Sequence, residues 1–280
     1  MTLATLSDVL TAANRDGYAV GGLVCLGWED MRAYARAAEA EGLPLILQAG
    51  PSCRKHTALP VLGAMFRHLA ESVSVPVVAH LDHGYTVEEC RLAIASGFTS
   101  VMFDGSRKPL DENIAETARI ADMAHAAGVS CEGEIGFVGY SGGEASDGTD
   151  PDEAARFARE TRVDAVAISV GNVHLQEKHE GGLDHDRIRA IEAVTDVPLV
   201  IHGGSGVPHD ERALLARTSR IAKFNIGTEL RMVFGKSLRA RLSEMPDAFD
   251  RVQILSGVED AICDAARAAL RSIGPKGGSA

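Results

Sequence analysis

Three histidines each follow a short apolar run at widely separated places in this sequence, and one of them is preceded by an aspartate. His83 follows VPVVAHLD, His174 ends the segment GNVH, and His202 follows VPLVI. Three neutral imidazoles with an open fourth position form the usual catalytic zinc arrangement. A carboxylate beside such a metal, here Asp82, can serve as acid or base. The three equivalent positions favour a zinc site, although for any single histidine a hydrogen-bonded structural role is commoner.

Two further carboxylates, Asp104 and Glu134, also stand at the ends of apolar runs. As oxygen donors they suit a second or transient metal position, or the orientation of a metal-binding histidine. A purely structural role, bonding loop amides, is an equal alternative. If Asp82 and His83 lie on an extended strand, their side chains are expected to point in opposite directions.

Glycine-rich segments follow the last two apolar runs. HGGSG spans 202–206 and NIGT spans 225–228. Loops of this kind let backbone N–H groups approach a phosphate closely, and Ser205 and Thr228 add hydroxyl donors. The two segments therefore predict a phosphate site beside His202.

These residues need elements that bring them together. Apolar runs alternate with amphipathic segments along most of the chain, which is typical of parallel strands buried on both faces. Strands are predicted at 18–26, 43–49, 75–81, 98–103, 129–135, 163–170, 197–201 and 220–226, and helices at 7–14, 29–41, 58–72, 87–96, 110–127, 152–160, 184–194, 210–218, 229–242 and 259–272. Eight such units in 280 residues match an α/β fold, a (β/α)8 TIM barrel with additional C-terminal helices, as a single domain over 1–280. In that fold the strand ends meet at one mouth, so the three histidines are expected to come together.

Local details complete the expected architecture. Ser7 is the predicted N-cap of the first helix. Residues 50–56 read as a loop whose Arg54, Lys55 and His56 either meet a second phosphate or, as we favour, face solvent. The glycine- and serine-rich segment 136–149 is predicted to be a mobile loop that closes over the site.

Composition limits the classes of function. The net charge of −11 argues against a nucleic-acid surface, but does not exclude a small anionic substrate, which is bound locally. Five widely spaced cysteines without a CxxC motif favour reduced thiols in a cytoplasm. Neither a signal peptide nor a membrane-spanning segment is recognised in the sequence.

In chain order, the segments AHLDHG, FTSVMFDGS, EGEIG, GNVH, HGGSG and FNIGTEL resemble the class II, metal-dependent ketose-bisphosphate aldolases. The resemblance covers residues 15–235, and segment 46–59 is more similar to the tagatose-bisphosphate branch than to the glycolytic one. It implies a barrel, a homodimer or homotetramer, that cleaves a ketose phosphate to dihydroxyacetone phosphate and an aldehyde. Zinc would act as Lewis acid and spread the resulting charge into an enediolate.

The resemblance also assigns roles to residues. His83, His174 and His202 would hold Zn²⁺, with Asp104 and Glu134 at a second position for a divalent metal or a monovalent cation. Asp82 would exchange the proton of the aldehyde oxygen, and Glu144 is the nearest loop carboxylate for the proton on the ketose carbon. The implied substrate-binding residues are Gln48, Ser52, Leu175, Gly203, Gly204, Ser205, Asn225, Ile226, Gly227 and Thr228.

Three segments depart from the family pattern, at four positions. Val24 and Leu26 stand where an asparagine-bearing segment usually ends the first strand, Leu175 replaces a glycine, and Gly227 replaces the aspartate of NIDT. Because these positions line the substrate rather than the metal, an aldolase for a non-hexose or deoxy sugar phosphate is a second hypothesis. A metal-dependent TIM-barrel hydrolase and a non-catalytic sugar-phosphate sensor are the remaining alternatives.

Overall fold

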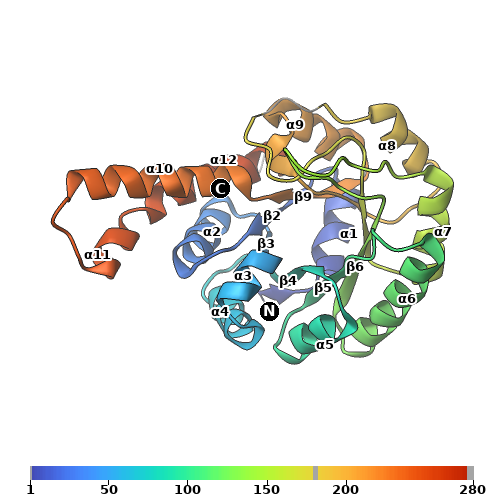
Figure 1. Cartoon of the computed structure of the whole chain (residues 1–280), viewed down its shortest axis with the longest axis horizontal. Helices are drawn as coiled ribbons and strands as arrows, with labels where there is room; N and C mark the ends of the chain where they lie inside the picture. The colour runs from blue at the N-terminus through green and yellow to red at the C-terminus, as the bar shows by residue number, and fades with distance from the viewer. Residues whose placement is uncertain (1, 179–181, 276–280) are drawn as a thin grey trace.

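The computed structural model describes residues 2–178 and 182–275, and it forms a closed parallel barrel (Figure 1). Its strands are β2 (Val20–Val24), β3 (Leu45–Ala49), β4 (Val77–Gly84), β5 (Ser100–Phe103), β6 (Ser130–Ile135), β7 (Ala165–Ile168), β8 (Leu199–Ile201) and β9 (Ile221–Ile226). Each pairs in parallel with its neighbours, and β2–β9 and β4–β5 pairings complete the ring. The predicted (β/α)8 barrel is therefore confirmed. That residues 1–280 form one domain stays a prediction.

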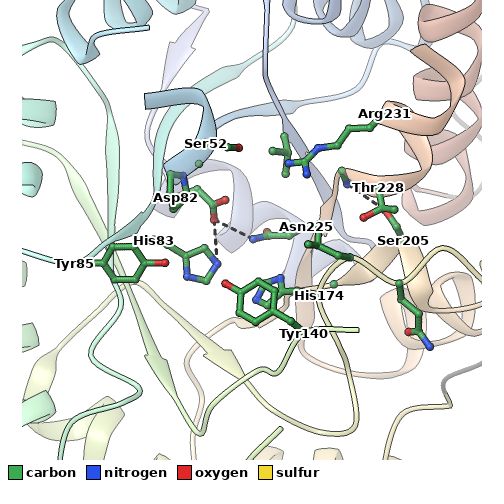
Figure 2. A pocket seen from close by; sticks show the side chains of 17 residues that line it. Ser52, Asp82, His83, Tyr85, Tyr140, His174, Ser205, Asn225, Thr228 and Arg231 are labelled. Carbon is green, nitrogen blue, oxygen red and sulfur yellow. Dashed lines mark hydrogen bonds and ion pairs between the residues drawn. The ribbon is translucent and has the colours of Figure 1, made fainter. Parts of the chain in front are cut away.

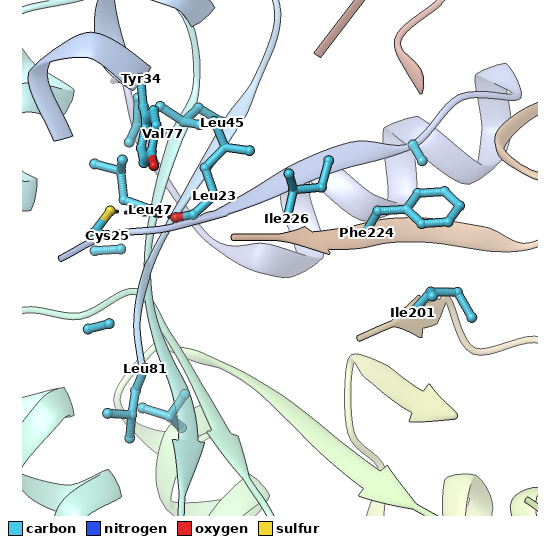
Figure 3. Packing of buried hydrophobic residues seen from close by; sticks show 14 of the residues in the cluster. Leu23, Cys25, Tyr34, Leu45, Leu47, Val77, Leu81, Ile201, Phe224 and Ile226 are labelled. Atoms are coloured by element: carbon cyan, nitrogen blue, oxygen red, sulfur yellow. Dashed lines mark hydrogen bonds between the residues drawn. The ribbon is translucent and has the colours of Figure 1, made fainter. Parts of the chain in front are cut away.

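Helices surround the barrel and bury their apolar faces on it (Figure 1). They are α2 (Trp28–Glu41), α4 (Leu59–Glu71), α5 (Val87–Ala95), α6 (Leu110–Ala126), α7 (Pro151–Thr161), α8 (His185–Glu192), α9 (His209–Thr218), α10 (Thr228–Glu244) and α12 (Glu259–Ile273). Leucine, isoleucine and phenylalanine side chains from the outer faces of the strands fill the layer between barrel and helices (Figure 3). This packed layer fixes the strand ends that carry the site.

The N-terminal segment closes the bottom of the barrel. A two-residue strand β1 (Leu3–Ala4), which the sequence did not predict, pairs with β4, and α1 (Leu6–Asp16) packs its apolar face on inward-facing strand residues such as Val78. The predicted N-cap at Ser7 is wrong. Thr5 caps the helix, because its hydroxyl accepts from Asp8 N while the Asp8 carboxylate accepts from Thr5 N.

Residues 51–56 form a short helix, α3 (Pro51–His56), rather than the predicted loop, with proline at its first turn. Arg54 does not face solvent as expected. Its guanidinium is buried and donates to the carbonyl oxygens of Ala49 (2.9 Å), Asp82 (2.6 Å) and His83 (2.9 Å). These bonds satisfy backbone acceptors at the ends of β3 and β4, beside the irregular pairing of β4 with β5.

The C-terminal helices extend the barrel on one side. α10 and the unpredicted α11 (Arg251–Ser256) project from it as an arm, and α12 returns to pack on α2 (Figure 1). No described helix is both long and apolar enough to cross a membrane.

The segment 136–149 is anchored at its base. An antiparallel bridge joins Phe137 to Asp147, and Tyr140 bridges to His174 beside the mouth of the barrel. The loop therefore lies next to the strand ends, and its predicted mobility stays a prediction.

Candidate active site

A cavity of about 320 Å³ opens at the C-terminal ends of the strands, as the barrel fold leads one to expect (Figure 2). It is lined by Val24, Gly50, Pro51, Ser52, Asp82, His83, Tyr85, Tyr140, His174, Leu175, Gln176, Gly203, Ser205, Asn225, Gly227, Thr228 and Arg231. Residues far apart in the sequence, from Val24 to Arg231, line this cavity together. Their polar side chains therefore face one common space.

The three predicted histidines converge at the floor of this cavity. His83 ends β4, His174 follows β7, and His202 follows β8. The ring centroid of His83 lies 4.7 Å from that of His202 and 5.2 Å from that of His174. One ligand atom from each lies within 4.8 Å of the others, a spacing that suits a single metal ion.

Asp82 and His83 do not point in opposite directions, contrary to the expectation for an extended strand. His83 has φ +52°, and the register of β4 against β5 shifts between Leu81 and Gly84. This left-handed residue breaks the alternation of side chains, so Asp82 Oδ1 lies 4.0 Å from His83 Nε2. Non-glycine residues seldom adopt such a conformation, and its presence in the site indicates a functional constraint.

Neighbouring carboxylates fix which histidine nitrogens face the metal position. His83 Nδ1 donates to Asp104 Oδ2 (2.8 Å), which leaves Nε2 available. His202 Nε2 donates to Glu132 Oε1 (3.1 Å), while the Nδ1 of the same ring is buried without a hydrogen-bond partner. A buried, unpartnered imidazole nitrogen next to two further imidazoles fits a zinc ion.

Glu134 and Asp104 lie on the other side of His83. Glu134 Oε2 is buried without a hydrogen-bond partner, 3.3 Å from His202 Nδ1 and 3.7 Å from His83 Nδ1. His83, Asp104 and Glu134 thus form a second group that can hold a metal. Burial, together with the charge of Asp104, raises the pKa of Glu134 well above its usual range.

The charges at the floor are strongly coupled. Burial disfavours the imidazolium, but the charges of Asp82, Asp104 and Glu134 outweigh it and raise the pKa of His83 to about 10. Burial and the charge of His83 lower the pKa of His174 to about 4. Among the two, the neighbouring carboxylates thus favour a positive charge at His83 and not at His174.

A buried polar network supports the floor from inside the barrel. Lys223 Nζ donates to Glu132 Oε2 (2.6 Å) and lies 3.3 Å from His80 Nε2, while His80 Nδ1 bonds Ser100 Oγ (2.8 Å). Lys223, Glu132 and His80 are fully buried. Glu132 thus connects Lys223 to His202, and this connection sets the orientation of the His202 ring.

Asp82 faces the cavity above the histidines. Its Oδ1 accepts from Asn225 Nδ2 at 3.3 Å, and its side chain is almost completely buried. Gly50 leaves room beside it, since a Cβ there would lie 3.3 Å from Asp82 Oδ2. The carboxylate is therefore held in place and remains accessible from the cavity (Figure 2).

The opposite end of the cavity is built for an anion. Ser205 Oγ accepts from the backbone N–H groups of Gly227 (3.1 Å) and Glu229 (3.3 Å) at the start of α10. Gly203 has φ +65°, and a Cβ there would lie only 2.2 Å from Val173 O. Glycine is thus required where the loop passes the anion position at a helix N-terminus.

Several predicted site residues are not brought into the cavity. Gln48 and Ile226 are fully buried, because Gln48 points into the barrel over Gly22 and Ile226 packs in the apolar layer. Gly204 is also buried outside the cavity lining. Glu144 is exposed, and its Oε2 pairs with Arg107 Nη2 at 2.7 Å.

Other lining residues escaped sequence reasoning. Tyr85 directly follows β4, and the Tyr140 ring stacks on His174 with centroids 4.9 Å apart. Gln176 and Arg231 also line the cavity. Arg231 had a signal in the sequence, since it lies one helical turn after the NIGT segment and therefore on the same side of α10.

The comparisons with known proteins agree with this site. Residues 4–278 match the family model described as fructose-bisphosphate aldolase class-II. The chain belongs to the class II fructose-bisphosphate aldolase family. Within this family it is 36% identical to the 6-phospho-5-dehydro-2-deoxy-D-gluconate aldolase of Bacillus subtilis, a match covering 100% of this chain and 98% of the relative. It is 35% identical to the fructose-bisphosphate aldolase of Geobacillus stearothermophilus, with both chains fully covered.

Solved structures of aldolases share the architecture. The crystal structure of the YdjI aldolase from Escherichia coli K12 superposes with a TM-score of 0.84 and 27% sequence identity, covering 99% of this chain and 100% of that one. This class II aldolase chain is therefore a carbon–carbon lyase. The assignment favours the aldolase over the hydrolase and the sugar-phosphate sensor.

Proposed function

We propose that this protein is a zinc-dependent aldolase that reversibly cleaves a ketose phosphate to dihydroxyacetone phosphate and an aldehyde. The main support is the convergence of three strand-end histidines and Asp82 in one cavity, with the candidate anion site of Gly203 and Ser205 at its other end. Asn225 lines the cavity between the histidines and the anion site, and its side chain donates a hydrogen bond to Asp82. A phosphorylated substrate bound at the anion site would therefore extend across the metal position toward Asp82.

His83, His174 and His202 would hold the zinc ion, since their ligand atoms lie within reach of one position. The bound ion would supply Lewis-acid polarisation of the substrate ketone. Asp104 and Glu134 would orient His83 or hold a second cation. The remaining chemistry is the movement of protons, and that falls to carboxylates of this chain.

In cleavage, Asp82 would take the proton from the hydroxyl group on the carbon that becomes the aldehyde. Its place above the histidines, held by Asn225, supports this role. Glu144 is proposed to deliver the proton to the ketose carbon once it leaves Arg107 and the loop 136–149 covers the cavity. A general acid or base of this kind contributes roughly 10²–10⁴-fold to a rate.

Three residues favour a substrate other than the hexose bisphosphates. Val24 and Gly227 offer no polar side chain to the cavity, and Leu175 projects into it with φ +57°. A shorter or deoxy aldehyde half suits this lining better than a phosphorylated triose. The family includes a relative named for a deoxy-gluconate phosphate, which supports a substrate of that kind.

The test is a substrate panel. Cleavage of fructose and tagatose bisphosphates and of deoxy ketose phosphates is followed by coupled detection of dihydroxyacetone phosphate, before and after treatment with a chelator. We expect chelator-sensitive cleavage with preference for a deoxy ketose phosphate. Activity that survives both metal removal and Asp82→Ala would contradict the mechanism, and a strong preference for either hexose bisphosphate would contradict the substrate class.

We also propose a homodimer or homotetramer and a cytoplasmic location. Exposed apolar side chains on the projecting arm, among them Phe249 and Val252, support assembly with further copies. The five cysteines are all unpaired and buried, which suits a reducing compartment. Sedimentation analysis of the purified protein tests the assembly.

A further inference from the structure

The guanidinium of Arg231 has no assigned use in the reaction described above. Among the described residues that line the cavity, Arg231 is the only lysine or arginine. Its Nε atom is buried without a hydrogen-bond partner, and its guanidinium makes neither a hydrogen bond nor an ion pair with any described residue. Arginine is suited to planar, two-point recognition of carboxylates and phosphates. An unpaired, half-buried guanidinium in a substrate cavity therefore indicates an anionic ligand group.

The surroundings of Arg231 leave it free for such a ligand. A Cβ on Gly227 would lie 3.8 Å from Arg231 Nη2 and 3.0 Å from Val24 Cγ2. Gly227 and Val24 thus flank the guanidinium without offering it an acceptor. An aspartate in place of Gly227 would stand beside Arg231 and neutralise it.

The side chain of Arg231 points from the start of α10 toward the Ser52 end of the cavity. Figure 2 shows its guanidinium between Ser52 and Thr228, with Ser205 further from Ser52 on the side of α10. The Ser205 hydroxyl, whose Oγ accepts from the N–H groups of Gly227 and Glu229, keeps its own hydrogen to donate to the phosphate at the start of α10. Ser52 and Asp82 lie at the end that receives the aldehyde half of the substrate.

We propose that Arg231 binds a carboxylate at the end of the aldehyde half, so that the substrate is a ketose phosphate of a sugar acid. This inference rests on the proposed aldolase function. In the reaction, the bond between the carbon next to the ketone and the hydroxyl-bearing carbon breaks, and its electron pair stays on the former. The hydroxyl proton passes to Asp82, the former carbon receives a proton, and the carboxylate is unchanged. The name of the 36% identical relative denotes a substrate with a phosphate at one end and a carboxylate at the other.

The test runs the reaction as a condensation of dihydroxyacetone phosphate with three aldehydes. The first, 3-oxopropanoate, ends in a carboxylate; butanal is its uncharged counterpart; glyceraldehyde 3-phosphate ends in a phosphate. For the wild-type enzyme we expect kcat/KM for 3-oxopropanoate to exceed that for both other aldehydes by about tenfold or more, the usual effect of a hydrogen bond between charged groups.

Variants identify the residue responsible. Arg231→Gln is expected to reduce the ratio of kcat/KM for 3-oxopropanoate to that for butanal by about tenfold or more. Arg231→Lys, which keeps the charge, is expected to reduce it less. Arg239→Gln, on an exposed part of the same helix, is the matched control and leaves the ratio unchanged.

The contrary outcomes are distinct. If the wild type shows no preference for 3-oxopropanoate over butanal, or prefers glyceraldehyde 3-phosphate, the carboxylate assignment is wrong while the aldolase function stands. If Arg231→Gln raises KM for dihydroxyacetone phosphate equally with every aldehyde, Arg231 binds the phosphate instead. A wild-type enzyme that condenses none of the aldehydes overturns the proposed function and the carboxylate assignment with it.

Discussion

The floor and the rim of the cavity are built in different ways. The floor, defined here as His83, His202, Glu132, Glu134 and Lys223, is buried, and its groups pair with one another or surround the metal position. The rim, defined as Val24, Ser52, Leu175, Gly227 and Arg231, is more open and contains an unpaired cation. The floor can vary little, because removal of one member leaves another buried polar group without its partner. The rim can vary with the substrate, because its side chains face the cavity rather than one another.

The largest expected effect comes from removing a metal ligand at the floor. His202→Ala deletes a fully buried ring whose Nδ1 faces the metal position. Loss of metal-ion catalysis, worth several kcal/mol, should lower kcat/KM by roughly 10³-fold or more. Metal content by mass spectrometry and cleavage rate are measured together. His125→Ala, on the outside of α6, is the control, and full metal content in His202→Ala would show that the ligand set is different.

Asp82→Asn separates proton transfer from metal binding. The asparagine keeps a similar shape but cannot accept a proton, so kcat is expected to fall about 10²–10³-fold while metal content is retained. Cleavage kinetics of the metal-loaded variant provide the measurement. A variant that loses metal and activity in parallel would instead place Asp82 among the ligands.

Residues of the floor were easier to predict from the sequence than residues of the rim. Strand-end histidines after buried apolar runs predicted the barrel and the convergence of His83, His174 and His202, since both follow from periodicity and fold geometry. The sequence did not predict the left-handed backbone conformation of His83. In a regular extended strand, side chains alternate, so the side chain of His83 was expected to point away from that of Asp82. Nor did composition reveal that Arg54 is buried, since its partners are backbone carbonyls from a distant strand.

Residues that contact the substrate were harder still to predict. Gln48 was expected at the substrate, but it fills the space that Gly22 leaves inside the barrel, and this depends on a neighbouring strand. Arg231 was missed although its place one helical turn after the NIGT segment was a signal, because the mixed composition of the helix does not show which side chain enters a cavity. For Gln48, contacts between neighbouring strands decide the position, and no local pattern shows them.

A change at Lys223, the floor residue deepest in the barrel, should act through the metal rather than directly on the substrate. Lys223→Met leaves Glu132 buried without its ion partner, which typically costs 3–5 kcal/mol of unfolding free energy. Because Glu132 also bonds His202, metal affinity is expected to fall by about 10–100-fold. Denaturant unfolding and metal titration test both effects, and Lys223→Met with Glu132→Gln should recover part of the stability. Unchanged metal affinity would show that the Lys223–Glu132 ion pair does not influence metal binding.

The smallest expected effect comes from the rim. Leu175 is half exposed and has φ +57°, a left-handed conformation that costs a side-chain-bearing residue roughly 1–2 kcal/mol. Leu175→Gly removes that strain, but glycine also gains freedom in the unfolded chain, so the net change in unfolding free energy is expected to stay within about 1 kcal/mol. Removing the side chain enlarges the cavity next to His174, so KM for bulkier ketose phosphates should fall several-fold relative to short ones. A parallel change in KM for all substrates would indicate that position 175 contacts the shared phosphate half, and Leu175 would then belong with the anion site rather than with specificity.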